Sequence, residues 1–299
     1  MADQDLNGKV IVITGASSGF GRGAALQFAQ EGASLVLAAR RDEVLDDLVQ
    51  QCEAKGARAW AVPTDVSQQA DVENLARQAI SQFGRIDVWI NNAGVGALGN
   101  FWDIPLADHA HVIETNLIGT IYGSYCALKQ FRQQQSGILI NTASGLGKFP
   151  APYYASYTAS KYGVVGLSAA LRQELSEAKL DDVHVCTVMP MAMDTPWFDH
   201  ASNYSGHEAQ PIPPVYDPKE VIDAYVRLAT KPEDEVIVGG AGKFMSALHS
   251  IFPGLVEGMM QKEVEVVEME KSPPAEKSSN SLYEPTEEGA TVYGGRLKH

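Results

Sequence analysis

The sequence predicts an α/β protein built on a doubly wound parallel sheet with helices on both faces. Short, continuous apolar runs alternate with longer amphipathic stretches, and strands that are apolar on both faces are typical of parallel sheets covered by helices. The first apolar run ends in a glycine-rich turn that opens a helix, as in sheets that bind nucleotides at the carboxyl ends of their strands. The chain of 299 residues, 45% of them hydrophobic, is long enough for one large domain of this kind.

The expected elements follow from the spacing of apolar residues along the chain. About seven strands share a short apolar run bounded by polar residues or glycine, and lie at 9–14, 34–39, 59–62, 88–91, 138–142, 183–189 and 235–238. The helices between them share apolar residues at helical spacing, and are expected at 21–31, 42–55, 67–83, 108–135, 155–179 and 217–230. Right-handed crossovers would bring the carboxyl ends of all the strands to one edge.

The chain divides into a catalytic domain and a C-terminal extension. Residues 1–242 hold the predicted sheet. Residues 243–262 are apolar but interrupted by Pro253 and Gly254, so they predict one or two short helices. These helices either fold over the domain, join a dimer interface or touch a membrane surface. Residues 263–299 are acidic and rich in serine and proline, which predicts a mostly disordered tail.

Composition limits the possible partners and compartment. The formal net charge of −14 makes non-specific binding to nucleic acid or anionic lipid unfavourable, so any phosphate must be held locally. The cysteines, Cys52, Cys126 and Cys186, are widely spaced and form no C-x-x-C pair, which indicates free thiols and no metal site. The chain has no run of about 18 apolar residues and no secretory signal. We therefore expect a cytoplasmic protein.

The turn after the first strand predicts a nucleotide site. Its glycines, Gly15, Gly19 and Gly21, let the backbone approach a pyrophosphate, and the free N–H groups of the following helix point at the phosphates. At the end of the second strand, an acidic residue would bind the ribose diol of NAD. This chain has Arg40 and Arg41 there, which fit a 2′-phosphate. The pair predicts a preference for NADP(H), with NAD(H) possible.

A Tyr-x-x-x-Lys pair supplies the candidate chemistry. Tyr157 and Lys161 share one face of a helix, and Ser144 lies in a glycine-rich turn after the fifth strand. A phenol, an ammonium and a hydroxyl suffice to move a proton to or from an alcohol oxygen. The ordinary pKa of a phenol, about 10, is too high for a base near neutral pH, and a neighbouring ammonium favours the phenolate.

The glycine turn, Ser144 and the Tyr-x-x-x-Lys pair are joined by two further motifs, Asn91-Asn92-Ala93-Gly94 after the fourth strand and Asn116. Together they keep the order and spacing of a known family. Over residues 8 to 240 the chain resembles the short-chain dehydrogenase/reductase family, which has a Rossmann-like fold. The resemblance implies hydride transfer between the nicotinamide and a carbonyl or secondary alcohol. It implies that Tyr157 is the general acid/base and that Lys161 lowers the pKa of Tyr157 and bonds the nicotinamide ribose.

The resemblance also implies further site residues. Ser144 would hold the substrate oxygen, and Asn116 would hold a water that links the lysine to solvent. Asp65 would contact the adenine, Asn92 would brace the sheet and Thr195 would contact the carboxamide. The full set of implied cofactor-binding residues is Gly15, Ser17, Ser18, Gly19, Phe20, Gly21, Arg40, Arg41, Asp65, Val66, Asn92, Ala93, Gly94, Tyr157, Lys161, Pro190 and Thr195.

Two departures from the family pattern bear on the site and the assembly. Met191 follows Pro190 where the family commonly has glycine, which leaves the cofactor seating and the pocket shape open. The C-terminal extension is positioned to cover the edge through which many members of the family form tetramers. The expected assembly is therefore a homodimer or a homotetramer. The long helices at 108–135 and 155–179 are the family's usual dimer contact.

The expected substrate is a small apolar or aromatic carbonyl or alcohol. This expectation rests on apolar loop residues at the catalytic edge, namely Leu98, Phe101, Trp102, Phe149, Pro150, Tyr153, Trp197 and Phe198. Residues 196–217 form either a substrate lid or a plain connector. One alternative function is a catalytically silent cofactor-binding regulator or scaffold, but the intact set of site residues argues against it. Another is a membrane-surface enzyme anchored by residues 243–262, but the net negative charge of the chain argues against binding to anionic lipid.

Overall fold

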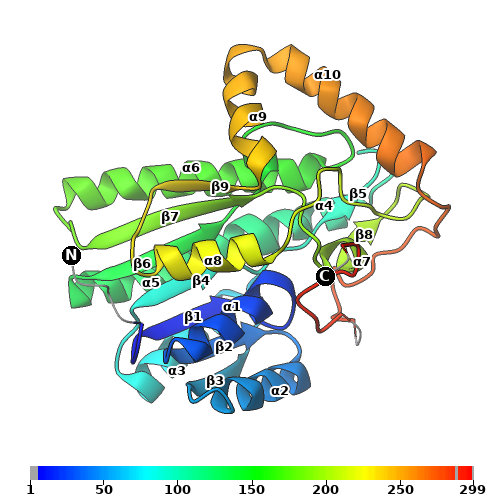
Figure 1. Cartoon of the computed structure of the whole chain (residues 1–299). Helices are drawn as coiled ribbons and strands as arrows, with labels where there is room; N and C mark the ends of the chain where they lie inside the picture. The colour runs from blue at the N-terminus through cyan, green and yellow to red at the C-terminus, as the bar shows by residue number, and fades with distance from the viewer. Residues whose placement is uncertain (1–5, 287–288, 298–299) are drawn as a thin grey trace.

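The computed structural model describes residues 6–286 and 289–297, and its centre is one seven-stranded parallel sheet (Figure 1). The strands lie in the order β3-β2-β1-β4-β6-β7-β9, which confirms the predicted doubly wound, Rossmann-like sheet. The order reverses between β1 and β4, and ligands of such sheets bind at that switch point. The strand bounds are β1 Val10–Thr14, β2 Ser34–Ala39, β3 Arg58–Pro63, β4 Val88–Asn91, β6 Gly137–Thr142, β7 Val183–Pro190 and β9 Glu235–Val238.

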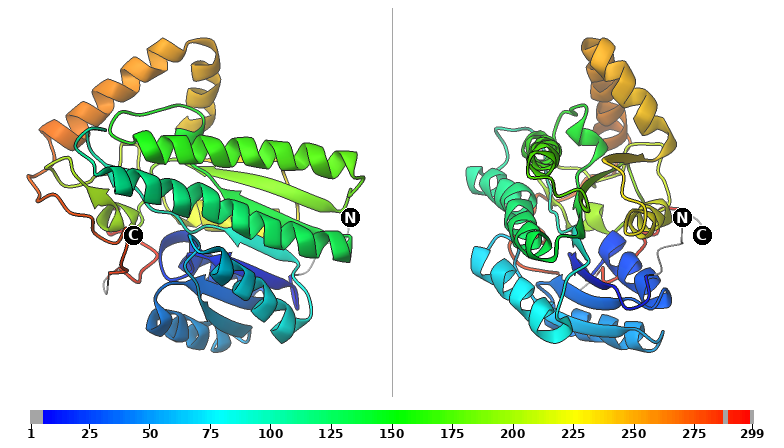
Figure 2. Two further views of the ribbon diagram at one scale, coloured as in Figure 1. Left: turned by 180° about the vertical axis from the view of Figure 1, so that it is seen from behind. Right: turned by 90° about the vertical axis from the view of Figure 1, so that its left-hand side faces the viewer.

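Helices cover both faces of the sheet because successive strand residues point to opposite sides. Ile11 and Ile13 pack in one cluster, whereas Val12 packs in the other. The first face is covered by α1 (Gly19–Gln30), α2 (Asp42–Glu53) and α8 (Lys219–Leu228). The second face is covered by α3 (Gln69–Phe83), α5 (Gly119–Gln134) and α6 (Ala155–Glu177) (Figure 2).

The helix expected at 108–135 is interrupted. It consists of α4 (Leu106–Ile113), a π-helical turn η1 (Glu114–Ile118) and then α5. π-helical turns are rare and frequently mark functional sites, and this one carries Asn116.

The segment expected as a loop at 196–217 contains short regular elements. It begins with α7 (Trp197–His200) and continues as β8 (Ser202–Asn203). β8 pairs in parallel with β5 (Ala97–Leu98), the segment that follows β4. This pairing ties the segment to the catalytic edge of the sheet.

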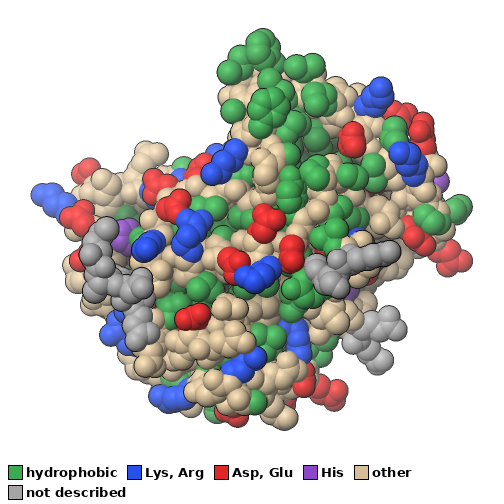
Figure 3. Space-filling model, in the orientation of Figure 1, with side chains coloured by type: hydrophobic (Ala, Val, Ile, Leu, Met, Phe, Trp, Pro, Cys, Tyr) green, Lys and Arg blue, Asp and Glu red, His purple; other side chains and the backbone are tan. Residues whose placement is uncertain are grey.

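The C-terminal extension forms a helical hairpin that projects from the sheet (Figures 1 and 2). It comprises α9 (Gly240–Ile251), α10 (Pro253–Val264) and a π-helical end η3 (Glu265–Glu270). Pro253 starts α10 at a position where its missing N–H costs no hydrogen bond. Apolar side chains are exposed on the hairpin (Figure 3), namely Phe244, Ile251, Phe252, Leu255 and Met259. Within the described part of the chain, no helix has both the length and the apolarity needed to cross a membrane.

The tail differs from the expectation of disorder. Its described residues lie against the domain, where Ser278 pairs in antiparallel fashion with Asn203 and Leu282 is fully buried. These described residues take their hydrogen-bond partners and apolar contacts from the loops of the domain, a source that the composition of the tail does not indicate.

Candidate active site

The carboxyl ends of the strands enclose a cavity of about 470 Å³. The pocket reaches from the glycine turn after β1 to the helix α6, and the C-terminal extension closes its outer side. All predicted site residues line it except Gly21 and Asn116. The structure therefore brings together segments that are far apart in the sequence.

The glycine turn fits a group that must approach the backbone closely. Gly15 and Gly19 have φ angles of 65° and 52°, in the left-handed region that favours glycine. A Cβ atom at Gly21 would lie 2.2 Å from the carbonyl oxygen of Gly15, so Gly21 contributes close packing instead of a ligand contact. The amide of Asn92 donates to the carbonyls of Thr14 and Gly15 at 3.0 and 3.2 Å. The turn is thus held rigidly at the N-terminus of α1, as a pyrophosphate site requires.

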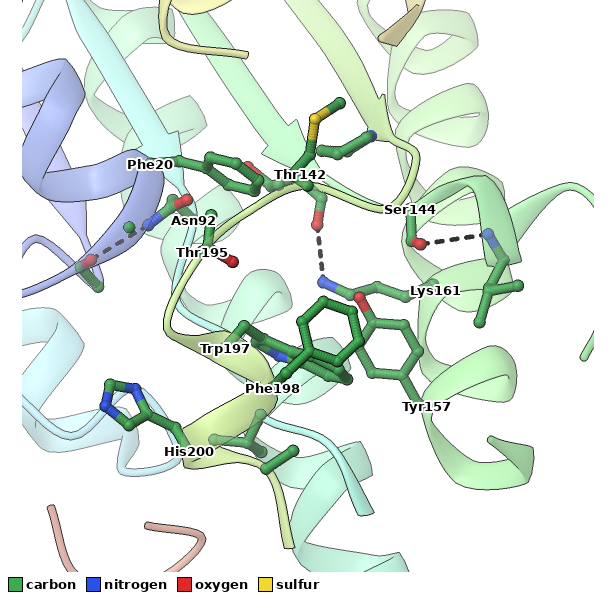
Figure 4. A pocket seen from close by; sticks show the side chains of 18 of the residues that line it. Phe20, Asn92, Thr142, Ser144, Tyr157, Lys161, Thr195, Trp197, Phe198 and His200 are labelled. Atoms are coloured by element: carbon green, nitrogen blue, oxygen red, sulfur yellow. Dashed lines mark hydrogen bonds between the residues drawn. The ribbon is translucent and has the colours of Figure 1, made fainter. Parts of the chain in front are cut away.

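Tyr157, Lys161 and Ser144 meet at the other end of the pocket (Figure 4). The Lys161 ammonium donates to the carbonyl oxygen of Thr142 at 2.9 Å and lies 5.5 Å from the centre of the Tyr157 ring. The Ser144 hydroxyl accepts the N–H of Leu146 at 3.2 Å, and its presence near the Tyr157 hydroxyl acts to lower the pKa of that phenol. α6 supplies the tyrosine and the lysine, and the end of β6 supplies the serine.

Burial dominates the protonation of this group in the protein alone. It raises the pKa of Tyr157 to about 12, against the opposing effect of the Ser144 hydrogen bond. It also lowers the pKa of Lys161 to about 8. In the protein without cofactor, Tyr157 is therefore a neutral phenol at neutral pH.

Asn116 lies behind the pocket and is fully buried. Its carboxamide oxygen accepts the N–H of Val95 at 2.8 Å, and its amide nitrogen donates to the Val95 carbonyl at 2.9 Å and to the Ser160 hydroxyl at 3.0 Å. The π-helical turn aims this side chain at the segment after β4. In the structure, Asn116 therefore fastens that segment to α6, directly behind Gly94 and Lys161.

At the adenosine end, both arginines are engaged by the tail. The guanidinium of Arg40 donates to the carbonyl oxygens of Ser281, Leu282 and Tyr283 at 2.7, 3.2 and 2.7 Å. The Arg41 guanidinium donates to the Thr286 carbonyl and the Ser17 hydroxyl, both at 3.1 Å. Burial lowers the pKa of both guanidinium groups. Sequence reasoning did not anticipate these partners, because the tail was expected to be disordered.

The substrate side of the pocket was predicted less well. Phe149, Trp197 and Phe198 line it, but Phe101 and Trp102 are 58% and 82% exposed on the surface. Leu98 is buried in the core, and Pro150 and Tyr153 face a separate shallow hollow. The lining residues that were not predicted include four with a flexible thioether side chain, namely Met193, Met245, Met259 and Met260. Met245, Met259 and Met260 belong to the apolar segment 243–262. The apolar composition of this segment was the sequence signal that could have identified them.

Met191 connects the sheet to the extension. A Cβ atom at Gly145, Gly239 or Gly242 would lie 2.6 to 2.8 Å from an atom of the Met191 side chain. Three glycines thus leave the space that this methionine fills at the start of α9. The side chain of Met191 fits beside the pocket because these three glycines have no side chains.

A buried pair joins the extension to the catalytic helix. Tyr154, the residue immediately before α6, donates its hydroxyl to the carboxylate of Glu268 in η3. Burial raises the pKa of Glu268 to about 7, although the hydrogen bond from Tyr154 acts in the opposite direction. The Tyr154 ring also meets the Tyr157 ring edge-on, with 6.4 Å between the ring centres. The extension therefore contacts a neighbour of the candidate catalytic tyrosine.

Comparison with known proteins agrees with this geometry. The family profile described as short chain dehydrogenase matches residues 9–204. The uncharacterized oxidoreductase YxnA of Bacillus subtilis is 35% identical over 98% of this chain and 80% of its own length. The 3beta-hydroxysteroid dehydrogenase 1 of Eggerthella lenta is 32% identical over 85% of this chain and 98% of its own.

Solved structures show the same fold. A short chain dehydrogenase/reductase from Burkholderia phymatum in complex with NAD has a TM-score of 0.76, with 30% identity over 85% of this chain and 96% of its own. An alcohol dehydrogenase from Thermococcus sibiricus complexed with 5-hydroxy-NADP has a TM-score of 0.65, with 26% identity over 77% of this chain and 95% of its own. The chain belongs to the short-chain dehydrogenase/reductase family and is an oxidoreductase that acts on CH–OH groups with NAD(P).

Proposed function

We propose that this protein is an NADP(H)-dependent oxidoreductase in which Tyr157 is the general acid/base. The observation that carries the proposal is the meeting of Tyr157, Lys161 and Ser144 on one wall of a pocket whose other end is the glycine turn. When bound, the nicotinamide would supply or accept the hydride. The tasks left to the protein are to hold the substrate and to move one proton.

The side chains divide these tasks. The hydroxyls of Ser144 and Tyr157 hold the substrate oxygen, and the neutral phenol donates its proton to the oxygen of a carbonyl that is being reduced. The Lys161 ammonium, oriented by the Thr142 carbonyl, stabilises the phenolate that results. Oxidation of an alcohol runs in reverse and begins from the phenolate. Because burial raises the pKa of Tyr157 to about 12, oxidation should speed up as the pH rises.

The replacement Tyr157→Phe tests the proton-transfer step. It keeps the ring and removes the hydroxyl, so kcat should fall by roughly 10² to 10⁴, while the Kd for NADPH should change less than about twofold. Stopped-flow turnover and cofactor fluorescence measure the two effects. The control is Tyr162→Phe, a half-exposed tyrosine on the same helix, which should retain activity. Turnover retained by the Tyr157 variant would remove this residue from the mechanism.

The preference for NADP(H) rests on Arg40. Its guanidinium lines the pocket beside Asp65, where an adenosine 2′-phosphate would lie. The replacement Arg40→Ala should weaken NADPH binding about tenfold or more and NADH binding little, since a bond between charged groups contributes roughly 1.5–3 kcal/mol. Arg58→Ala, at an exposed arginine of β3, is the control. Equal losses for the two cofactors would contradict the assignment.

The substrate class follows from the pocket wall. Methionine and aromatic side chains form the side opposite the glycine turn, which suits an apolar carbonyl or secondary alcohol. The name of the Eggerthella lenta relative, a hydroxysteroid dehydrogenase, is compatible with an apolar substrate here. A screen of ketones, aldehydes and secondary alcohols, followed by cofactor absorbance, should show activity that increases with apolar substituents.

The assembly and the compartment belong to the same proposal. Ile121 and Tyr125 on α5 and Tyr162 on α6 expose apolar surface along two long helices, which suits a homodimer or homotetramer built on these helices. Light scattering of purified protein measures the assembly. Three free cysteines, Cys52, Cys126 and Cys186, suit a cytoplasmic location.

A further inference from the structure

The end of the chain runs past the donors that the cofactor needs. We define the C-terminal strap as residues 281–286 and 289–297. It descends from the helical hairpin to the N-terminus of α1 (Figure 1). Ser281, Pro285 and Thr286 line the pocket. The strap is therefore part of the wall of the cofactor site.

Backbone oxygens of the strap accept hydrogen bonds from the phosphate-facing donors. Arg40 gives its terminal N–H groups to three strap carbonyls. The first N–H of α1, that of Gly19, donates to the Thr291 carbonyl at 2.8 Å. In the proposed complex, Arg40 would bind the 2′-phosphate and the N-terminus of α1 would face the pyrophosphate. At both places a neutral carbonyl oxygen stands where a phosphate oxygen would be bound.

Side chains and backbone fasten the strap on both sides of these donors. Leu282 is 1% exposed and packs with Ala97, Ile104 and Val112. The Tyr283 hydroxyl donates to the Asp108 carboxylate at 2.8 Å. At the other end, the N–H groups of residues 296 and 297 donate to the carboxylate of Asp194 at 2.7 to 3.0 Å. Asp194 immediately precedes Thr195, so the strap reaches from the adenosine end to the nicotinamide end of the site.

We propose that the C-terminal strap is an internal competitor of the cofactor and sets the preference between NADPH and NADH. Either cofactor binds when the strap carbonyl releases the Gly19 amide, and NADPH binding also requires the release of Arg40. Because a charged phosphate forms a stronger hydrogen bond than a neutral carbonyl, the 2′-phosphate regains the bonds that Arg40 gives up. A cofactor without this phosphate leaves Arg40 to the strap. The proposal rests on the role of Arg40 in the proposed function.

The consequence is measurable as an affinity. A site that is available in only a fraction of the molecules binds with an apparent Kd raised by the inverse of that fraction. Loosening the strap should therefore tighten cofactor binding. The effect should be larger for NADPH, because Arg40, which would bind the 2′-phosphate, donates hydrogen bonds to three strap carbonyls.

The test uses the full chain with a weakened anchor. Leu282→Ala and the stronger Leu282→Asp remove the apolar contact that holds the strap beside Arg40, and neither touches the catalytic group. Fluorescence titration should show at least threefold tighter NADPH binding and a smaller change for NADH. Hydrogen exchange at the Gly19 amide, which the Thr291 carbonyl protects, should become faster. Leu255→Ala, at a 55% exposed leucine of α10, should change neither.

Two results would overturn the proposal. One is unchanged NADPH affinity in a variant whose Gly19 amide exchanges faster, since the strap would then be open without effect. The other is weaker NADPH binding, which would make the strap a part of the binding site. The variant Arg40→Ala tests the proposed NADP(H) preference independently of the strap. A selective loss of NADPH affinity in this variant supports the role of Arg40, even where the strap proposal fails.

Discussion

The sheet and the C-terminal extension are stabilised in different ways. In the sheet, fully buried side chains such as Ile13 and Leu37 pack between strands and helices. In the extension, backbone groups of the strap are hydrogen-bonded to Arg40, Gly19 and Asp194. Large apolar side chains of the hairpin such as Phe244 and Ile251 are exposed. The sheet is therefore the rigid part, and the extension can open locally at a lower free energy.

This difference separates two roles within one site. The sheet positions the glycine turn and the candidate catalytic group, which must keep a fixed geometry. The extension contributes the strap and Met245, Met259 and Met260, which line the outer side of the pocket. A region of lower local stability is suited to that second role, because ligand exchange needs a part that moves.

A matched pair of leucines tests the comparison most strongly. Leu37 and Leu282 are 0% and 1% exposed, so their truncation to alanine removes the same buried atoms. Leu37→Ala should lower the free energy of unfolding by about 2–5 kcal/mol. Leu282→Ala should lower it much less, because the strap can detach while the sheet stays folded. Urea unfolding followed by tryptophan fluorescence measures both values.

The same experiment can contradict the distinction. Equal losses of stability in the two variants would show that the strap unfolds only together with the sheet. Hydrogen exchange of the strap in the Leu282 variant gives an independent reading, since detachment exposes its amides without exposing those of β2.

A smaller effect on the stability of the extension is expected from a change in pH, because the buried Glu268 carboxyl beside Tyr154 titrates. Burial raises the pKa of Glu268 from its ordinary value of 4.5 to about 7. Below pH 4.5 the carboxyl is protonated in both the folded and the unfolded state. Between pH 4.5 and 7 it ionises in the unfolded state first, so the extension loses up to roughly 3 kcal/mol of stability as the pH rises.

Glu268→Gln is the control for this effect, because the amide keeps the shape and the contact with Tyr154 but does not titrate. The extension should then open with little dependence on pH. Proteolysis of the hairpin at pH 5 and pH 8 measures the opening. A wild-type protein that is cleaved equally fast at both values, after correction for protease activity, would show that this carboxyl does not control the extension.

Local patterns were sufficient for the parts of the site that the sheet builds. Continuous apolar runs predicted the seven strands, and the glycine spacing placed Gly15 in the turn after β1 and Gly19 at the start of α1. The pair of Tyr157 and Lys161 could be located because helical geometry fixes two residues four positions apart. In each case the informative residues lie close together in the sequence.

Other features had no local signal. Phe101 and Trp102 were predicted to line the pocket because they follow β4, but their loop carries them to the surface. The π-helical turn directs the amide of Asn116 at Val95 and Ser160, two partners that the sequence pattern did not indicate. Neither the path of a loop nor the site of a π-helical turn follows from apolar periodicity.

By itself, the sequence therefore determined the sheet, the glycine turn after β1 and the residues of the candidate catalytic group. The tertiary structure decided what surrounds them. Arg40 meets the Tyr283 carbonyl across 243 positions of the chain, and the methionines of the extension reach the pocket from beyond the last strand. The sequence-predicted elements follow from interactions between neighbours, whereas these contacts depend on how distant segments pack once the sheet has formed.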